Sequence, residues 1–467
     1  MTKAALIVLA PVFSERHNVF VLPQKGDESS LDAHRIAALW GLRASALFLL
    51  CVGCAGPTPP AVSSAASHPS SSAPSKPASN ALYVSPTVYD FSNNPELLAR
   101  IVESPHGYFR FINRPFSEAV CQADIPMLAP RVNLHGDAHV EQYAVTDLGR
   151  GLTDFDDATT GPATIDLMRF GVSLMLTTAA RGWQASQEQL LSQFLKGYRH
   201  ALETPDAQAP APAAARRIRD GFKKDRAAYF VGLNKITQPM SPDAQTALKK
   251  ALVPYTQTMR KQSPELPEGF FGVIDTRRLQ IGIGSALDDK FLVRVAGPSK
   301  DPLDDVVLEV KEVRDLTGIS CINAAPSQDP FRVLVGQSRI AYRPHRFLGY
   351  IHFEKRTFWI HAWVDNYREF KIDRTAQTPE ELAEVVYDVG MQLGRGHPNQ
   401  IAAPFDLQLR DALTQMLDGC EGDLRKAVMR LTEEVQVSWE RFKYEASSAA
   451  ARGTPKGART RTDAAGE

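Results

Sequence analysis

The chain of 467 residues lacks the features that would assign it to several large classes at once. It has no surplus charge, since 53 Lys and Arg balance 53 Asp and Glu, and a general nucleic-acid binder needs excess cations for phosphate contacts. No run approaches the roughly 18 consecutive apolar residues of a spanning helix, which excludes a multi-pass membrane protein. A hydrophobic fraction of 43% and a charged fraction of 23% exclude a wholly disordered chain.

Cysteine is scarce and irregularly spaced. Of the five cysteines, Cys51 and Cys54 lie near the N-terminus, while Cys121, Cys321 and Cys420 are odd in number and far apart. No pair has CxxC spacing, and no set has the spacing of a structural zinc site. The sequence therefore indicates neither a disulfide framework nor a zinc site.

A short apolar stretch near the N-terminus has the pattern of an export signal. Arg43 precedes the apolar residues 44–52, and Gly53 and Cys54 follow. This resembles a bacterial lipoprotein signal, which implies lipidation of Cys54 and an exported, membrane-anchored protein, although Cys51 occupies the position where Leu is usual. The alternative is a buried helix in a cytoplasmic protein.

The residues around this stretch bear on both interpretations. In residues 55–80, 20 of 26 are Pro, Ser or Ala, so the segment cannot bury enough apolar surface to fold and is expected to be a flexible tether. In addition, 42 residues precede Arg43, and no Met lies between Met1 and Met127. If the signal is real, synthesis is expected to begin at an alternative codon.

The rest of the chain predicts an α+β protein. We expect a helical lobe over 81–278, a β-rich module over 279–370 with mainly antiparallel strands, C-terminal helices over 371–445 and a basic disordered tail over 446–467. Periodicity and capping residues predict helices over 95–130, 164–181, 186–202, 214–232, 242–260, 378–393 and 421–444. They predict strands over 131–134, on both sides of 147–151, and over 279–283, 290–296, 306–313, 347–353 and 357–364.

Paired carboxylates mark the first candidate site. His135, Asp137 and His139 alternate in the segment HGDAH, and the segment DFDD brings Asp154 and Asp156. A predicted hairpin joins the two segments and would direct both into one cleft. Phosphoryl transfer needs one carboxylate to accept or orient the nucleophile's proton and another to hold Mg²⁺. The alternatives are a tight turn at HGD and an exposed acidic loop at DFDD.

A third segment, beginning at Gly161-Pro162 and containing Asp166-Leu167, follows shortly afterwards. The ordered series resembles the catalytic half of aminoglycoside and choline kinases, members of the protein-kinase-like superfamily. The resemblance implies that Asp137 is the catalytic Asp, that Asp154 and then Asp156 bind Mg²⁺, and that Asp166 is a structural residue at a helix start, where it complements the helix dipole.

The β-rich module carries the second candidate site. Gly282, Gly284 and Ser285 form a Gly-rich turn, and Lys311 lies on an apolar strand with its side chain opposite to those of its apolar neighbours. The pair resembles a kinase nucleotide loop and its phosphate-binding Lys; a plain β-turn and an edge-strand Lys are the alternatives. Because these residues follow Asp137, the resemblance implies a kinase-like two-lobed fold whose lobe order is circularly permuted.

The whole pattern resembles the bacterial domain-of-unknown-function family 2252. The resemblance rests on segments in matching order over about residues 100–400: Ser104-Pro105, Phe109-Arg110, His135–His139, Asp154–Asp157, Gly161-Pro162, Asp166-Leu167 with Arg169, Gly282 to Ser285, Lys311-Glu312, Gly336-Gln337, Phe347–Tyr350 and Leu393 with His397. The strand expected to read R-Q-L-x-D-x-K has a different sequence over 361–367, and three further positions depart from the pattern. Gln142 replaces an Asn that would bind a second metal, Glu141 replaces Gly, and Val335 replaces an acidic residue that could pair with Lys311.

Three functions follow from these patterns. The first is an ATP- and Mg²⁺-dependent phosphotransferase with an unknown small-molecule or protein acceptor; the departures make a weakened member an alternative. The second is a metal-dependent hydrolase that uses the His-x-Asp-x-His residues with DFDD. The third is a non-catalytic, ligand-binding surface lipoprotein. We also expect the neutral net charge to average an acidic cleft around Asp137 and Asp154 with a basic tail and a basic helix face over 216–226, which is solvated or, as the alternative, an anion site.

Overall fold

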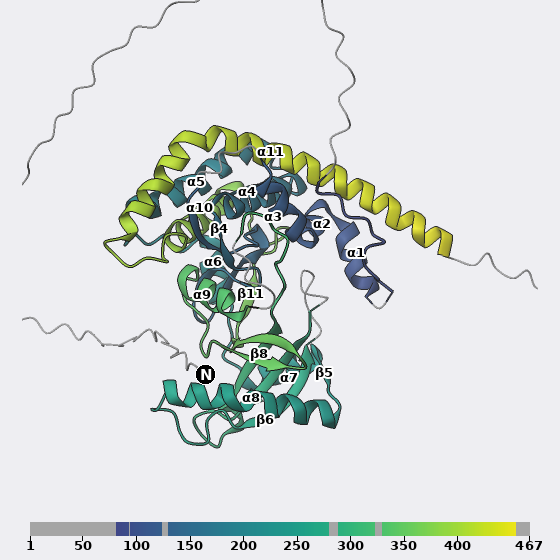
Figure 1. The fold of residues 1–467 in the computed structure, drawn as a ribbon, viewed down its shortest axis with the longest axis vertical. Coiled ribbons are helices and arrows are strands. Elements are labelled where there is room, and N and C mark those ends of the chain that lie inside the picture. The colour runs from purple at the N-terminus through teal and green to yellow at the C-terminus, as the bar shows by residue number, and fades with distance from the viewer. Residues whose placement is uncertain (1–80, 93, 124–128, 280–287, 323–328, 454–467) are drawn as a thin grey trace, which may run out of the picture. The chain divides into compact units, whose positions relative to one another are not determined.

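The computed structural model describes residues 81–453 apart from residues 93, 124–128, 280–287 and 323–328 (Figure 1). Within these residues the chain is a mixed α+β protein whose strand pairs are all antiparallel, as predicted. None of the helices described is long and apolar enough to span a bilayer. Cys54, the tether 55–80 and the Gly-rich turn with Gly282, Gly284 and Ser285 lie outside the described residues.

Three short helices replace the long helix predicted from residue 95. They are α1 (Pro95–Glu103), α2 (Pro105–Phe111) and α3 (Asn113–Cys121). The prediction was wrong because Pro105 restricts the residue before it to extended conformations, and Ser104 has φ −154° and ψ 155°. Ser104 also caps α2, since its Oγ accepts a hydrogen bond from the backbone of Gly107 at 3.0 Å.

Four longer helices form the main helical core. They are α4 (Thr164–Ala180), α5 (Gln187–Glu203), α10 (Pro379–Gly396) and α11 (Asp406–Gly453), and α11 runs along α4 and α5 (Figure 1). The contact between α5 and α10 is so close that a Cβ atom on Gly390 would lie 2.1 Å from the backbone oxygen of Phe194. Helix α11 begins well before the predicted residue 421 and continues through Gly419 and Gly422 without a break.

The remaining helices correct two further expectations. The helix predicted over 214–232 is divided into α6 (Ala213–Asp220) and α7 (Arg226–Lys235), because Gly221 follows the first and the Asp225 side chain caps the second at 2.9 Å. Helix α8 (Pro242–Gln262) was predicted, whereas α9 (Pro330–Ile340) was not. Short 3₁₀ turns occur at η1 (Val140–Gln142), η2 (Gln184–Ser186) and η3 (Pro302–Asp304).

The largest sheet has six strands in the spatial order β5-β6-β7-β8-β10-β9. The strands are β5 (Thr237–Pro239), β6 (Val273–Leu279), β7 (Lys290–Val295), β8 (Val306–Glu312), β9 (Gly349–Phe353) and β10 (Arg356–Ala362). Of the strand predicted over 279–283, the structure describes only Leu279, the last residue of β6, and residues 280–283 lie outside the described residues. The other four predicted strands of the module are confirmed to within two residues.

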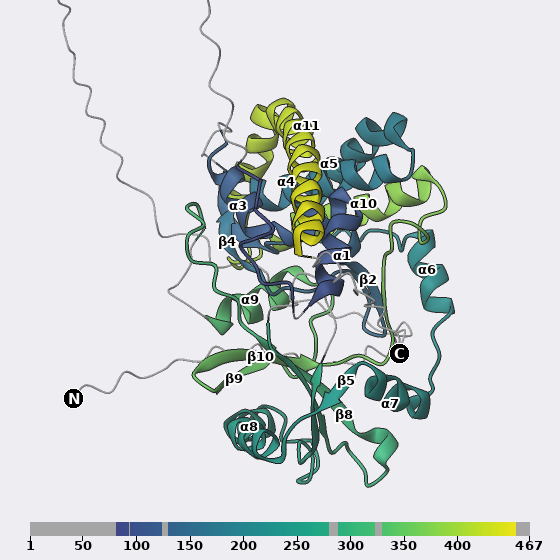
Figure 2. The same ribbon diagram turned by 90° about the vertical axis from the view of Figure 1, so that its right-hand side faces the viewer.

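The two faces of this sheet differ in chemistry because side chains alternate along each strand. Leu308 and Val310 pack with α8 in an apolar core, while Glu309 and Lys311 point to the opposite face, as predicted. That face also carries Trp359 of β10, which packs with residues of α9 and the helical core. Figure 2 shows α8 and α9 on opposite sides of the sheet.

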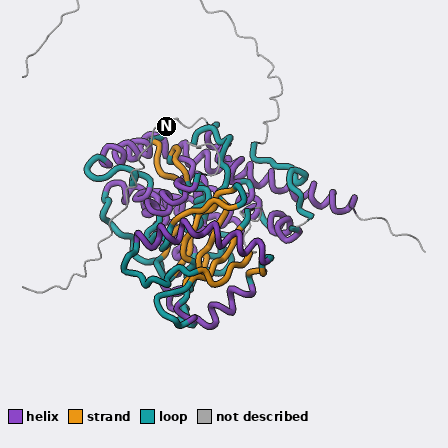
Figure 3. Tube along the Cα trace, turned by 60° about the horizontal axis from the view of Figure 1, so that its bottom comes forward, coloured by secondary structure: helices purple, strands orange, loops and turns teal. Residues whose placement is uncertain are grey.

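Two small sheets connect the helical residues to this sheet. Strand β1 (Arg131–Leu134) pairs with β4 (Thr159–Pro162), and the hairpin β2 (Tyr143–Thr146) and β3 (Arg150–Leu152) pairs with β11 (Tyr367–Glu369). The hairpin confirms the fold-back predicted between HGD and DFDD. Because β11 follows β10 directly, the chain returns from the six-stranded sheet to this hairpin. In Figure 3 most of the strands, in orange, lie in the middle of the molecule with helices around them.

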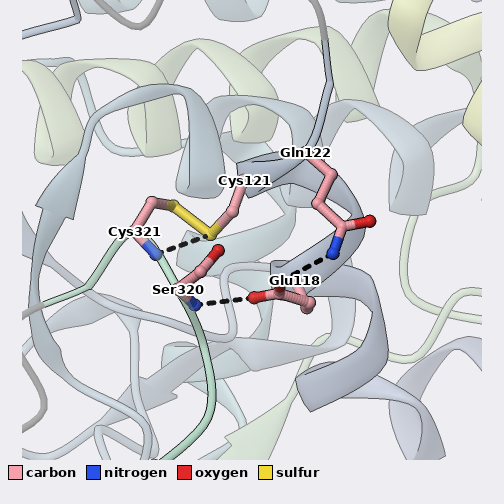
Figure 4. The surroundings of a disulfide bond; sticks show 5 residues. All are labelled: Glu118, Cys121, Gln122, Ser320 and Cys321. Carbon is pink, nitrogen blue, oxygen red and sulfur yellow. Dashed lines mark hydrogen bonds between the residues drawn. A yellow bond between two sulfur atoms is a disulfide. The ribbon is translucent and has the colours of Figure 1, made fainter.

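A disulfide joins Cys121 and Cys321, which are 200 residues apart (Figure 4). It links the end of α3 to the segment that follows β8, where the backbone of Ser320 also donates a hydrogen bond of 2.6 Å to Glu118. The expectation of no disulfide was therefore wrong. The spacing of cysteines along the sequence does not reveal a pair that tertiary folding brings together. Among the residues described, Cys420 is the free cysteine.

Candidate active site

A cavity of about 850 Å³ lies between the six-stranded sheet and the loops of the two small sheets. It brings together four of the predicted site residues, Asp137, Gln142, Asp154 and Lys311. The first three come from the HGD and DFDD segments, and the last comes from β8, so side chains up to 174 positions apart share one cleft. We use "the cleft" for this cavity below.

Asp137 lies in a tightly held turn after β1. Gly136 has φ +80°, and a Cβ atom there would lie 2.0 Å from the backbone oxygen of Asp157, so only glycine fits. The carboxylate of Asp166, at the start of α4, accepts hydrogen bonds from the backbone of His135 at 2.6 Å and of Gly136 at 2.9 Å. Asp166 thus has the structural position that the family resemblance implied.

His397 supports Asp166 from the other side. Its Nε2 lies 3.1 Å from an Asp166 oxygen, and its Nδ1 lies 2.8 Å from the hydroxyl of Tyr198. All three side chains are buried. This network explains His397 as a core contact, and it holds the turn that positions Asp137.

The Asp137 carboxylate is held by a buried arginine. Arg169 of α4 places Nε and Nη2 at 2.8 and 2.7 Å from Oδ1, and its guanidinium lies over the ring of Phe109. Burial nevertheless raises the pKa of Asp137 above its usual value, with Arg169 acting in the opposite direction. Oδ2 faces the cleft, where the side-chain nitrogen of Gln142 lies 3.4 Å away.

Lys311 is shared by two carboxylates of the DFDD segment. Its Nζ lies 2.7 Å from Oδ1 of Asp154 and 2.7 Å from Oδ2 of Asp156, and Trp359 donates a 3.0 Å hydrogen bond to Asp156. Burial acts to raise the pKa of Asp154, but Lys311 holds it well below its usual value. Burial and the charge of Asp154 raise the pKa of Asp156 to about 7. Lys311 is therefore fully paired without an acidic residue at Val335.

Gln142 lies between the two cleft-facing carboxylates. Its amide nitrogen is 3.4 Å from Oδ2 of Asp137 and 3.5 Å from Oδ2 of Asp154. A half-turn rotation of the side-chain amide exchanges its nitrogen and oxygen, and Oε1 would then lie where the nitrogen is now, beside two carboxylate oxygens. This all-oxygen donor set suits Mg²⁺, which takes one or two carboxylates and completes its shell with water and substrate phosphates.

The two histidines of HGDAH do not share the cleft with Asp137. Both are fully buried: His135 has Nε2 at 2.9 Å from the backbone oxygen of Thr153, and His139 packs edge-on against His106. Burial lowers the pKa of His139 well below its usual value, so this ring is neutral. The positive φ of Gly136 bends the segment. Among the described residues, no group of three or more His, Cys, Asp or Glu side chains could hold a metal ion.

The cleft is not acidic overall, contrary to the expectation from the sequence. Its walls include nine cationic side chains and four acidic ones, counted as Arg100, Arg110, Arg217, Lys290, Lys311, Arg314, Arg368, Lys371 and Arg374 against Asp137, Asp154, Glu309 and Glu369. The prediction considered only the HGD and DFDD segments, whereas most of the cations come from distant helices and from the chain after β11. A spacing pattern could not have found them.

Several further residues complete the cleft on the side of the sheet. Glu309 pairs with His361 at 2.9 Å, and the His361 ring lies 4.6 Å from Trp359, stacked on it, and 4.3 Å from His345. The alternation of β8 places Glu309 on the same face as Lys311, which is a readable signal. Nothing local predicts the contact with His361, because it depends on the pairing of β8 with β10.

These features define a mixed α+β protein with one cleft in which carboxylates, a lysine and an excess of surrounding cations converge. The chain belongs to the family described as "Uncharacterized protein conserved in bacteria (DUF2252)", which matches residues 95–229 and 222–445. The predicted resemblance to this family is therefore confirmed. Neither a curated protein nor a solved structure matches the chain.

Proposed function

We propose that the protein is an ATP- and Mg²⁺-dependent phosphotransferase with a kinase-like fold. The observation that carries this proposal is the meeting of Asp137, Gln142 and Asp154 with Lys311 in one cleft. The spacing from Asp137 to Gln142 equals that between the catalytic Asp and the metal-binding Asn of a protein-kinase catalytic loop. Lys311 lies on the third strand counted from β6, as the phosphate-binding Lys of kinases lies on their third strand.

The residues divide the chemistry between them. Asp137 has the raised pKa of a group able to accept a proton from a hydroxyl nucleophile, and Arg169 holds its other oxygen in place. Asp154 stays ionised beside Lys311, and Asp154 and Gln142 would hold Mg²⁺, which supplies charge neutralisation for the phosphates when bound. Lys311 would bind phosphate oxygens.

The order of the two parts supports a circular permutation as a further proposal. The HGD and DFDD segments precede the six-stranded sheet in the chain, while protein kinases place the Gly-rich loop and Lys first. After β10, the pairing of β11 with the β2–β3 hairpin brings the chain back to the side of the HGD segment. The chain therefore enters the six-stranded sheet from this part of the fold and returns to it afterwards.

A nucleotide-binding experiment tests the proposal. Thermal unfolding of the full chain should shift upward with ATP and Mg²⁺ together, and the shift should vanish in Lys311→Met and shrink in Asp154→Asn. Lys300→Ala, which removes an exposed lysine away from the cleft, should keep the full shift. Absence of a Mg²⁺-dependent shift in the natural protein would overturn the proposal. A shift with ATP that is the same without Mg²⁺, and no phosphate transfer, would instead favour a non-catalytic binding protein.

We also propose that the chain is exported and anchored through Cys54. The disulfide between Cys121 and Cys321 supports this, because disulfides persist in oxidising compartments and are rare in the cytosol. Export would require a phosphate donor in the same compartment. Mass spectrometry of the native N-terminus tests the anchor: a lipid-modified Cys54 is expected, and an unprocessed Met1 in mature protein would refute it.

A further inference from the structure

One part of the cleft wall is almost entirely cationic. It consists of Arg100 of α1, Arg110 of α2, Arg217 of α6, Arg368 of β11, and Lys371 and Arg374 beyond β11. These segments contribute a single acidic side chain, Glu369, to the cleft wall. Four separate stretches of chain therefore converge to give one positive surface, which we call the basic wall. Arg110, Arg217 and Lys371 of this wall pair with the carboxylates of Glu141, Glu381 and Glu369, which offset part of the mutual repulsion.

The basic wall lies on the Asp137 side of the cleft. Arg110 donates to Glu141 at 2.9 Å, Glu141 lies 3.9 Å from the ring of His106, and that ring packs against His139. His139 is in turn 3.8 Å from Oδ2 of Asp137. The cations on the other side of the cleft, Lys311 and Arg314, are bound to the carboxylates of the DFDD segment.

Lys371 belongs to the same side as Arg110. Lys371 directly follows Phe370, whose backbone donates to the backbone oxygen of Tyr143 at 2.8 Å, next to Gln142. Arg217 in turn donates to the backbone oxygen of Thr375 at 3.0 Å, which places it beside the segment that carries Lys371 and Arg374. The basic wall is thus a continuous surface next to Asp137.

Arg100, Arg368 and Arg374 give the basic wall capacity for a ligand, and Arg368 donates to the backbone oxygen of Tyr367 at 2.9 Å. Arg100 and Arg374 are paired with Glu96 and Asp373, whose side chains are 86% and 73% exposed and lie outside the cleft wall. Exposed pairs of this kind contribute little, because water screens them and the long side chains lose entropy. A ligand anion inside the cleft can replace these partners at small cost.

We propose that the group accepting phosphate at Asp137 is carried by an anionic molecule, such as a sugar phosphate, a sugar acid or another hydroxyl compound with a phosphate or carboxylate group. This inference rests on the proposed function, since it takes Asp137 as the residue that faces the acceptor hydroxyl. The hydroxyl would lie at Oδ2, and the anionic group would lie on the basic wall. Aminoglycosides and choline are cations, and a positive wall beside Asp137 would repel them.

A set of three related sugars that differ in charge tests the charge preference. Glucose 6-phosphate, glucose and glucosamine share a ring and hydroxyl groups but carry negative, zero and positive charge. Isothermal titration of the full chain, with and without Mg²⁺ and a non-hydrolysable ATP analogue, should show glucose 6-phosphate binding at least tenfold more tightly than the other two. Equal or tighter binding of glucosamine would overturn the inference.

Charge reversal on the basic wall then locates the site. Arg368→Glu with Arg374→Glu changes two exposed residues and should weaken glucose 6-phosphate binding at least tenfold at an unchanged unfolding temperature. The matched control is Lys300→Glu with Lys426→Glu, which alters net charge equally away from the cleft and should change binding less than twofold. An equal loss in the control would show a general charge effect and overturn the inference.

The two proposals fail in different ways. Anion preference that depends on the basic wall, without any binding of the ATP analogue, would keep the anion site and reject the phosphotransferase. Binding of the analogue that requires Lys311, without an anion preference, would keep the phosphotransferase and reject the anionic acceptor.

Discussion

The ion pair between Arg169 and Asp137 offers the sharpest test of the site's electrostatics. Arg169 is fully buried and Asp137 is 6% exposed, so Arg169→Met would leave a buried carboxylate without its cation. Breaking a buried pair from one side costs about 3–5 kcal/mol of unfolding free energy. At 1.36 kcal/mol per pKa unit, this corresponds to a further rise of about two to four units in the pKa of Asp137.

This shift has a definite sign with pH. The folded-state pKa of Asp137 is already raised, so the folded state binds its proton more readily than the unfolded chain does. In the variant, the loss of stability should therefore be smallest at the acid end, near pH 4, where the folded state favours protonated Asp137 and the unfolded chain holds it about half protonated. It should then grow as pH rises through the raised folded-state pKa. Urea unfolding followed by circular dichroism between pH 4 and pH 8 measures the change.

The double variant Arg169→Met with Asp137→Asn is the control. Removal of both charges should recover most of the stability lost in Arg169→Met, because no buried charge then lacks a partner. A loss below about 1 kcal/mol, or a loss of equal size at both ends of the pH range, would refute the reasoning. Failure of Asp137→Asn to restore stability would assign the effect to the packing of Arg169 on Phe109 instead.

Three other perturbations have expected outcomes. Because the pKa of Asp156 is raised to about 7, its ionisation lowers stability as pH increases from about 4 to 7, and Asp156→Asn should flatten this dependence in unfolding experiments at several pH values. Reduction of the disulfide, or Cys321→Ser, should lower the free energy of unfolding by about 2–5 kcal/mol, measured by urea unfolding with and without reductant. Gly390→Ala should destabilise strongly, since its Cβ would lie 2.1 Å from a backbone oxygen of α5, and a thermal midpoint equal to that of the natural protein would show that the two helices can separate freely.

Much of the local structure could be predicted from short-range patterns. Thr378 begins α10 as a capping residue, with its Oγ1 accepting from the backbone of Glu381 at 3.3 Å, and Leu308 and Lys311 occupy opposite faces of β8. These features depend on residues a few positions apart, which interact whatever the tertiary fold. Where a prediction failed, as at Ser104 and Gly221, a local signal competed with the apolar periodicity and prevailed.

The site itself was only half predictable. The carboxylates and Lys311 were identified by type, but their pairing joins residues 157 positions apart, and the disulfide joins residues 200 apart. Such contacts follow from the packing of the six-stranded sheet against the β2–β3 hairpin, and they produce no periodic pattern in the sequence. The basic wall was missed for the same reason, since its arginines look like ordinary solvated residues within each separate segment.

The two departures in the HGD segment have different physical consequences. Glu141 introduces a charge where the family pattern has glycine, but Arg110 neutralises it at 2.9 Å, so it costs little and leaves Asp137 in place. Gln142 is longer than asparagine by one methylene group, yet its amide still lies within 3.5 Å of both cleft-facing carboxylates. Neither departure therefore removes a donor from the position where the proposed chemistry needs one.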